Sequence, residues 1–160
     1  YPQLASCSVY EKINPASTAE SKAALGADLR DKRVTAVVTL DLGLSRGMTD
    51  ESLAALPVPT LVIAAGVPSH DLPAELESAN LAKRLPSATS RYVEISDASH
   101  FSFLSICKPG AEVMLEEDVP GDGIICRDGD NGRPREVIQQ QITSLIAEFL
   151  QSPIDKEGSL

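Results

Sequence analysis

The sequence predicts an α/β fold in which a parallel sheet is flanked by helices. Two short apolar runs, 34–40 and 60–65, have the composition of strands covered on both faces, and 92–95 resembles a third strand. Helical segments alternate with these runs, which is typical of a parallel sheet covered by helices. We therefore expect one partial domain over 1–150, with three strands and about four helices, followed by a polar tail at 151–160.

The expected helices are recognised by their capping residues and by the spacing of their apolar residues. Ser17 and Thr49 are candidate N-caps because acidic residues follow each of them within one turn. The segment 107–134 is rich in Gly, Pro and Asp, so we expect it to be a loop. The four segments predicted to be helical are 17–29, 49–56, 73–85 and 134–150.

Composition and charge exclude several classes of protein. The chain is 42% hydrophobic and 23% charged, so we expect a folded domain rather than a disordered chain. Its net charge of −9 argues against nucleic acid and anionic membranes as partners. No apolar run is long enough to span a bilayer. Tyr1 is followed by polar sequence without a signal-like segment, so we expect a processed product or a fragment.

Three cysteines bear on the cellular compartment. Cys107 and Cys126 lie 19 residues apart around the predicted loop, a separation that suits a disulfide. Such a bond would indicate a secreted or periplasmic protein, whereas three free thiols would indicate a cytosolic one. Cys7 is left over, and an odd cysteine in an oxidised protein suggests a partner on another piece of chain.

We expect neither a metal nor another cofactor. The sequence has no Cys-x-x-Cys motif and no cluster of His and Cys residues with zinc-ligand spacing. The acidic stretch 128–132 resembles the start of a calcium loop, but its twelfth position is Gln139 instead of an acid. We therefore interpret this stretch as a turn.

Candidate catalytic residues follow each predicted strand. Asp41 comes directly after the first strand, His70 and Asp71 follow the second, and His100 follows the third. Ligands of open α/β sheets bind outside the carboxyl ends of the strands, so these side chains are expected at one edge. We expect His100 to meet Asp41 or Asp71 there and to act as a general base, because a carboxylate fixes the imidazole tautomer. His70 is expected to be exposed and without a catalytic role.

Two stretches resemble segments of the α/β-hydrolase superfamily. The run DESLAALPVPTLVIAAG at 50–66 is similar to a strand segment that is common to many of these hydrolases. The run ASHFSFL at 98–104, with Cys107 after it, resembles the histidine loop of the predicted dienelactone hydrolase and platelet-activating-factor acetylhydrolase-like branch. Ser99 stands where that branch usually has Gly. The resemblance covers roughly 30–150 and corresponds to the C-terminal half of the fold.

This resemblance implies a serine-type carboxylic ester hydrolase that works through an acyl-enzyme and acts on a small-molecule ester. His100 would be the base. In acetylhydrolase-like members the acid follows the strand that matches 34–40, which implies Asp41. In dienelactone-type members it follows the next strand, which implies Asp71. We favour Asp41 because it directly follows its strand, and we keep Asp71 as the alternative acid.

The nucleophile is harder to place. Gly43-Leu44-Ser45-Arg46-Gly47 fits the Gly-x-Ser-x-Gly pattern, but its loop is long and the following helix is short, unlike a nucleophile elbow. We interpret the match as coincidental, and we expect the serine and the oxyanion donors upstream of Tyr1 or on a second chain. The alternatives are a small self-sufficient esterase that uses Ser45 and a catalytically silent assembly or binding module.

The small sheet also bears on the assembly of the protein. Three parallel strands make a thin core, and one side of the sheet would end in an apolar edge unless something pairs with it. We therefore expect that the chain is not a free monomer and that it associates with its missing N-terminal half, with a second chain or as a homo-oligomer.

Overall fold

The computed structural model describes residues 12–68, 73–128 and 132–152. The backbone forms two compact units, Tyr1–Val34 and Thr35–Leu160. Each unit is described by itself.

The first unit contains the helix α2 (Ala19–Leu25). Its N-cap is Thr18, whose side chain accepts a hydrogen bond from the Ser21 N–H, while the Ser21 side chain accepts one from the Thr18 N–H. The N-cap is thus one residue later than the expected Ser17. The helix ends before Gly26, its C-cap, and so stops short of residue 29. The Gly26 N–H still donates to the Lys22 carbonyl, and its φ of −91° is one that any residue adopts, so glycine is a poor helix former here and is not required for a left-handed turn.

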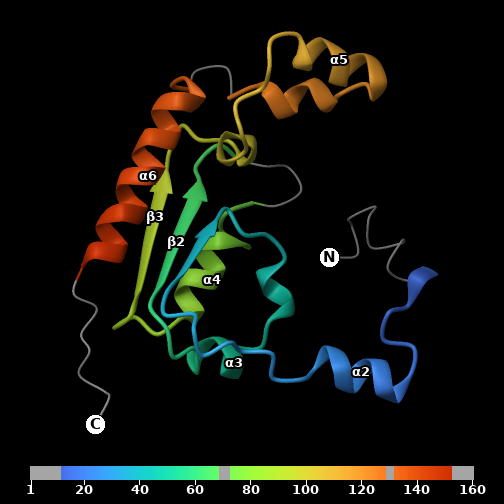
Figure 1. Cartoon of the computed structure of the whole chain (residues 1–160), viewed down its shortest axis with the longest axis vertical. Helices are drawn as coiled ribbons and strands as arrows, with labels where there is room; N and C mark the ends of the chain where they lie inside the picture. Colours follow the sequence, from blue (N-terminus) through green and yellow to red (C-terminus); the bar gives the residue numbers. More distant parts are fainter. Residues whose placement is uncertain (1–11, 69–72, 129–131, 153–160) are drawn as a thin grey trace. The chain divides into compact units, whose positions relative to one another are not determined.

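The second unit contains a three-stranded parallel sheet in the order β1-β2-β3 (Figure 1). Its strands are β1 (Val37–Leu40), β2 (Thr60–Ala65) and β3 (Ser90–Ile95). The α/β class with a parallel sheet and flanking helices is thus confirmed. All six residues of β2 are buried, as a strand covered on both faces requires. The prediction that the first strand is covered on both faces is wrong. β1 is shorter than 34–40 and only partly buried, and among the described residues it pairs with β2 alone.

Helices cover both faces of the sheet in Figure 1. Leu61 and Ile63 of β2 point to one face and pack in a cluster with residues of α6 (Arg135–Gln151). Val62 points to the other face and packs with residues of α3 (Asp50–Ala54) and α4 (Ser78–Arg84). Each fully buried aliphatic side chain stabilises the fold by about 1.5–3 kcal/mol. The two clusters therefore anchor β2 at the centre of the unit.

The helix boundaries differ from the sequence expectations mainly in the middle of the chain. The helix α3 begins after its N-cap Thr49, as expected, because the Thr49 side chain accepts a hydrogen bond from the Ser52 N–H. The helix α4 begins at Ser78 rather than at residue 73. The helix α6 matches the predicted span within one residue at each end.

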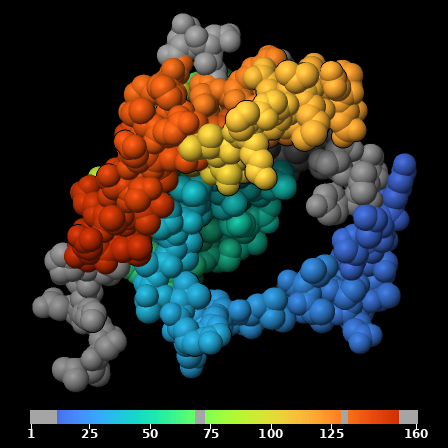
Figure 2. Space-filling view, turned by 45° about the horizontal axis from the view of Figure 1, so that its top comes forward, coloured from blue at the N-terminus to red at the C-terminus, as the bar shows by residue number. Residues whose placement is uncertain are grey.

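The segment 107–134 is not the irregular loop that its composition predicts. It contains α5 (Ala111–Asp118) and the 3-10 helix η3 (Asp122–Cys126), orange in Figure 2 beside the N-terminal end of α6. The helix α5 buries none of its residues and exposes Val113 and Met114, so it lacks the apolar stripe by which helices are recognised. The Glu116 carboxylate accepts hydrogen bonds from the backbone N–H groups of Gly121 and Gly123, which closes the turn.

Both outer strands have an open edge. Within the described residues, β1 and β3 each pair only with β2. Leu40, at the end of β1, is exposed. The polar tail predicted at 151–160 falls outside the described residues beyond Ser152. In the described segments, none of the helices combines the length and the apolar character needed to cross a membrane.

Gly66 directly follows β2, and its N–H donates a hydrogen bond to the Ile95 carbonyl. A Cβ atom at this position would lie 2.4 Å from the Ser96 Cα, whereas a Cβ at Gly47 would have nothing within 4 Å. We expect Gly66→Ala to lower the free energy of unfolding in urea by about 2–3 kcal/mol, because backbone atoms must move to relieve the overlap. Gly47→Ala is the matched control and should change it by less than about 0.5 kcal/mol. Equal effects of the two substitutions would contradict the close approach of these loops.

Candidate catalytic site at the carboxyl ends of the strands

Asp41 occupies the turn that ends β1. Its N–H donates to the Ile63 carbonyl at 2.7 Å, and its Oδ1 accepts a hydrogen bond from the Ala65 N–H at 3.0 Å. Its φ of 46° lies in the left-handed region, which Asp enters more readily than most residues. The side chain is 12% exposed. Backbone and side chain together therefore fix Asp41 against β2, with one carboxylate oxygen remaining for another partner.

That partner is His100, the first residue of the 3-10 helix η2 (His100–Phe103) after β3. Its Nδ1 lies 2.7 Å from the Asp41 Oδ2. A capping box formed by Ser99 and the buried Ser102 begins η2 and sets where His100 leaves the loop. The imidazole is 45% exposed. The structure thus brings together the first and third strand ends, as the parallel topology implies.

The contact has a direct electrostatic effect. The hydrogen bond to Asp41 raises the pKa of His100 above its usual value, and partial burial opposes this shift to a smaller extent. A carboxylate only accepts hydrogen bonds, so the neutral imidazole must carry its proton on Nδ1. Nε2, across the ring, is then unprotonated and able to accept a proton. This arrangement suits a general base whose tautomer is fixed by an acid.

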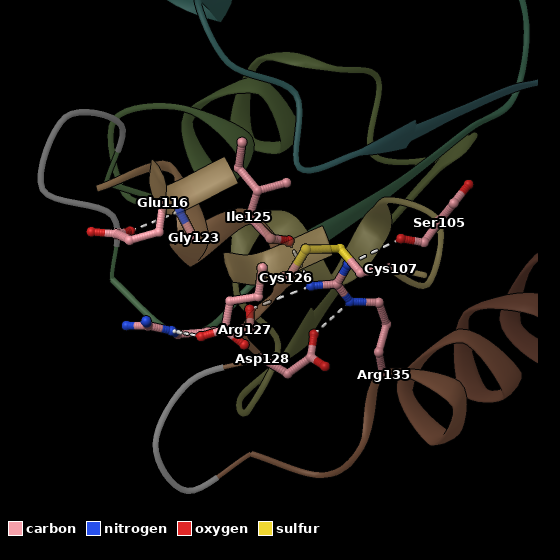
Figure 3. Close-up of a disulfide and its surroundings, with 10 residues drawn as sticks. Ser105, Cys107, Glu116, Gly123, Ile125, Cys126, Arg127, Asp128 and Arg135 are labelled. Atoms are coloured by element: carbon pink, nitrogen blue, oxygen red, sulfur yellow. Dashed lines mark hydrogen bonds and ion pairs between the residues drawn. A yellow bond between two sulfur atoms is a disulfide. The ribbon is translucent and has the colours of Figure 1, made fainter. Parts of the chain in front are cut away.

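A second set of contacts holds the segment that follows His100. Arg135, at the start of α6, is only 3% exposed. Its guanidinium donates to the Asp128 carboxylate at 2.7 Å and to the Ser105 carbonyl at 3.1 Å (Figure 3). The Ser102 hydroxyl donates to the same carboxylate oxygen of Asp128 at 3.3 Å. The buried cation therefore joins η2, the loop after it and α6.

The expected disulfide is present beside the contacts of Arg135. Cys107 and Cys126 are bonded, and they close the excursion that carries α5 and η3 (Figure 3). Arg135 also donates to the Ile125 carbonyl at 2.9 Å, next to this bond. The role of Arg135 was not foreseen, because most of its acceptors are a carboxylate and backbone carbonyls of a segment that was expected to be an irregular loop. Cys7 lies outside the described residues.

Ser45, the candidate nucleophile of the Gly-x-Ser-x-Gly match, is completely buried in the 3-10 helix η1 (Ser45–Gly47). Its hydroxyl donates to the Glu77 carbonyl at 3.0 Å, and its N–H donates to the Glu77 carboxylate at 3.1 Å. The 3-10 helix is followed by a further cap and the short α3, instead of a long helix that starts at the serine. A hydroxyl without solvent access that is already bonded to a carbonyl is poorly placed to attack a substrate.

The other candidate residues give less information. His70 and Asp71, the alternative acid, both lie outside the described residues. Asp128, at the start of the calcium-like stretch, is bonded to Arg135, and residues 129–131 are not described. Among the residues that are described, no group of three or more His, Cys, Asp and Glu side chains is arranged to hold a metal ion.

The disulfide is expected to stabilise the second unit. Replacing both cysteines, Cys107→Ser with Cys126→Ser, should lower the free energy of unfolding by about 3 kcal/mol, because the unfolded chain then regains its loop entropy. Cys7→Ser is the control, since it leaves the bond intact. Thiol titration of the denatured, unreduced wild type should find at most one free thiol for each chain. Three free thiols would contradict the disulfide.

The raised pKa of His100 makes stability depend on pH in a defined direction. The fold favours protonated His100, so this stabilisation is complete below the unfolded pKa of about 6.5 and is lost as pH rises through the folded pKa. The unfolding free energy of wild type should therefore exceed that of His100→Gln by more at pH 5.5 than at pH 9. Urea unfolding at both values measures this difference, and a difference that does not change with pH would contradict the ion pair.

Comparison with known proteins adds no assignment to this geometry. No family model, no curated protein and no solved structure matches the chain. The function has to be inferred from the arrangement of Asp41 and His100 and from the residues around them.

Proposed function

We propose that this chain supplies the general base His100 and the orienting acid Asp41 of a serine-type carboxylic ester hydrolase. The observation that carries the proposal is the 2.7 Å contact between Nδ1 of His100 and Oδ2 of Asp41 beyond the ends of parallel strands. The imidazole is nearly half exposed, so its far side can meet another group. The resemblance of residues 98–104 to an α/β-hydrolase histidine loop supports the same assignment.

The reaction would proceed through an acyl-enzyme. Nε2 of His100 takes the proton of a serine hydroxyl as its oxygen attacks the ester carbonyl, and Asp41 stabilises the resulting imidazolium. The imidazolium then returns the proton to the departing alcohol, and the acyl group remains on the serine. Water attacks this acyl group with His100 again as the base, which releases the carboxylic acid. The substrate class is a small-molecule ester.

The serine and the oxyanion donors belong to a part of the protein that is not in this sequence or to a second polypeptide. Ser45 is buried and its hydroxyl is bonded to Glu77, which argues against the self-sufficient esterase. Within the described residues the outer edge of β1 is open and Asp41 directly follows the strand, so a further strand that pairs there in parallel would bring its own carboxyl end beside the Asp41–His100 pair. We favour this arrangement over a homo-oligomer, because a second copy would present the same Ser45, which is completely buried in the described structure.

The disulfide supports a location in an oxidising compartment. Bonds of this kind persist in secreted and periplasmic proteins and are rare in reducing cytosol. We therefore place the hydrolase outside the cytosol, in keeping with the Cys107–Cys126 bond.

One observation favours a second candidate, a catalytically silent assembly module. The described sheet has two open edges, and an open edge is suited to pairing with another chain. Such a module would use the same edge of β1 without any need for His100 to move a proton. The two candidates therefore differ in whether a reactive serine accompanies the chain.

Labelling of the native sample with a fluorophosphonate tests the proposal, because this reagent reacts with base-activated serines. We expect a labelled serine on a co-purifying polypeptide, located by peptide mass analysis. His100→Ala should slow the labelling by about 10²–10⁴-fold, through loss of the general base. His70→Ala, which changes the other histidine, should have little effect. A label on Ser45 would establish the self-sufficient esterase, and no label on any chain would favour the silent module.

The rate of ester hydrolysis by the native sample distinguishes the two acids. Asp41→Asn should reduce ester hydrolysis by about 10³–10⁴-fold, because an amide no longer enforces the Nδ1–H tautomer. Asp71→Asn should leave hydrolysis nearly unchanged. A large loss with Asp71→Asn and a small one with Asp41→Asn would transfer the role of the acid to Asp71.

A further inference from the structure

The start of α4 contacts the segment that carries Asp41. The Ser78 hydroxyl lies 3.3 Å from the Asp41 Oδ1 and 3.5 Å from the Leu42 carbonyl oxygen. The preceding residue, Glu77, accepts both the N–H and the hydroxyl of Ser45. Two consecutive residues of one element therefore hold the turn after β1 along most of its length.

The two residues that make these contacts, at the N-cap and the first position of α4, are buried. Ser78 is completely buried, and Glu77 is 2% exposed. Buried polar groups are almost always hydrogen-bonded, because an unpaired one costs the full free energy of its lost hydration. Leu81 of α4 is 3% exposed and packs against Val62 of β2, so the position of Ser78 is fixed by the core. The hydroxyl is thus a permanent neighbour of the acid.

The carboxylate of Asp41 divides its two oxygens between different partners. Oδ1 faces the Ala65 N–H and the Ser78 hydroxyl, whereas Oδ2 faces His100. A single donor on Oδ1 would allow the carboxylate to turn about its Cβ–Cγ bond. Donors from two elements, β2 and α4, define the plane of the group and with it the direction of Oδ2.

We propose that Ser78 is a positioning residue for the acid, and that its buried hydroxyl acts with the Ala65 N–H to keep Oδ2 of Asp41 on Nδ1 of His100. Ser78 itself touches no substrate. It acts through Asp41 and His100, so its importance for catalysis rests on the proposed hydrolase function. The effect of Ser78 on the His100 imidazole does not depend on the proposed hydrolase function. The test of Ser78 can therefore fail or succeed independently of the test of the hydrolase.

The test is an NMR titration of the His100 ring in the native protein and in Ser78→Ala. If the hydroxyl positions the carboxylate, its removal weakens the bond between Asp41 and His100, and the His100 pKa falls. If the hydroxyl only stabilises the negative charge, its removal makes Asp41 a better acceptor, and the pKa rises. A rise or no change would overturn the proposal.

Two further variants separate the hydrogen bond from packing. Ser45→Ala is the control, because it removes another completely buried serine hydroxyl, which donates to the Glu77 carbonyl, and leaves the Asp41 contacts in place. The His100 pKa of Ser45→Ala should therefore stay at the wild-type value. Ser78→Cys nearly keeps the volume but offers a weak donor, so it should behave like Ser78→Ala. An equal fall in Ser45→Ala, or a wild-type pKa in Ser78→Cys, would show that packing is responsible.

Kinetic measurements test the effect of Ser78 on catalysis separately from the NMR titration. In a sample that hydrolyses esters, Ser78→Ala should lower kcat/KM by about two- to tenfold, the equivalent of one ordinary hydrogen bond. Unchanged kcat/KM would overturn the catalytic part of the proposal. If no serine is labelled, the hydrolase function fails, while the titration still decides whether Ser78 positions Asp41.

Discussion

The end of β1 is held by hydrogen bonds that leave Asp41 little freedom. Its N–H is bonded to Ile63, its Oδ1 to Ala65 and Ser78, and its Oδ2 to His100. The left-handed φ of 46° is costly for a residue other than glycine and persists only where surrounding contacts determine it. Because β2 and α4 supply most of these contacts, the buried centre of the sheet also sets the geometry of the exposed imidazole. A change in the packing of β2 or α4 would therefore also change the position of the Asp41 carboxylate and of His100.

His100 is positioned by a different set of contacts. Ser102, two residues after it, is bonded to Asp128, and Asp128 is bonded to the buried Arg135. A buried cation is tolerated only when its donors are satisfied, and Arg135 meets this requirement with a carboxylate and several backbone carbonyls. The disulfide then closes the intervening excursion. The two partners of the candidate site are thus fixed by separate elements, α4 behind the acid and α6 behind the histidine.

The sequence predicted the parts that follow from topology. Asp41 and His100 each come after an apolar run, and parallel strands place such residues at the same edge of the sheet. The helix α5 was missed because it buries no residue and exposes Val113 and Met114, so no apolar stripe marked it. The partial exposure of β1 was missed because composition does not tell an edge strand from a central one. Ser78 was missed because its partner Asp41 lies 37 residues away in the sequence. Arg135 was missed because most of its acceptors belong to a segment whose composition predicted an irregular loop, so no burial was expected there.

The proposed function requires that Asp41 fixes the tautomer of His100 and leaves Nε2 able to accept a proton. The most direct measurement is the ¹⁵N spectrum of the His100 ring in the native protein, recorded at a pH where the imidazole is neutral. In the wild type we expect a protonated Nδ1 and an unprotonated Nε2. In Asp41→Asn we expect the reverse, with the proton on Nε2. A ring that carries its proton on Nε2 in the wild type, or that averages between both nitrogens, would contradict this expectation.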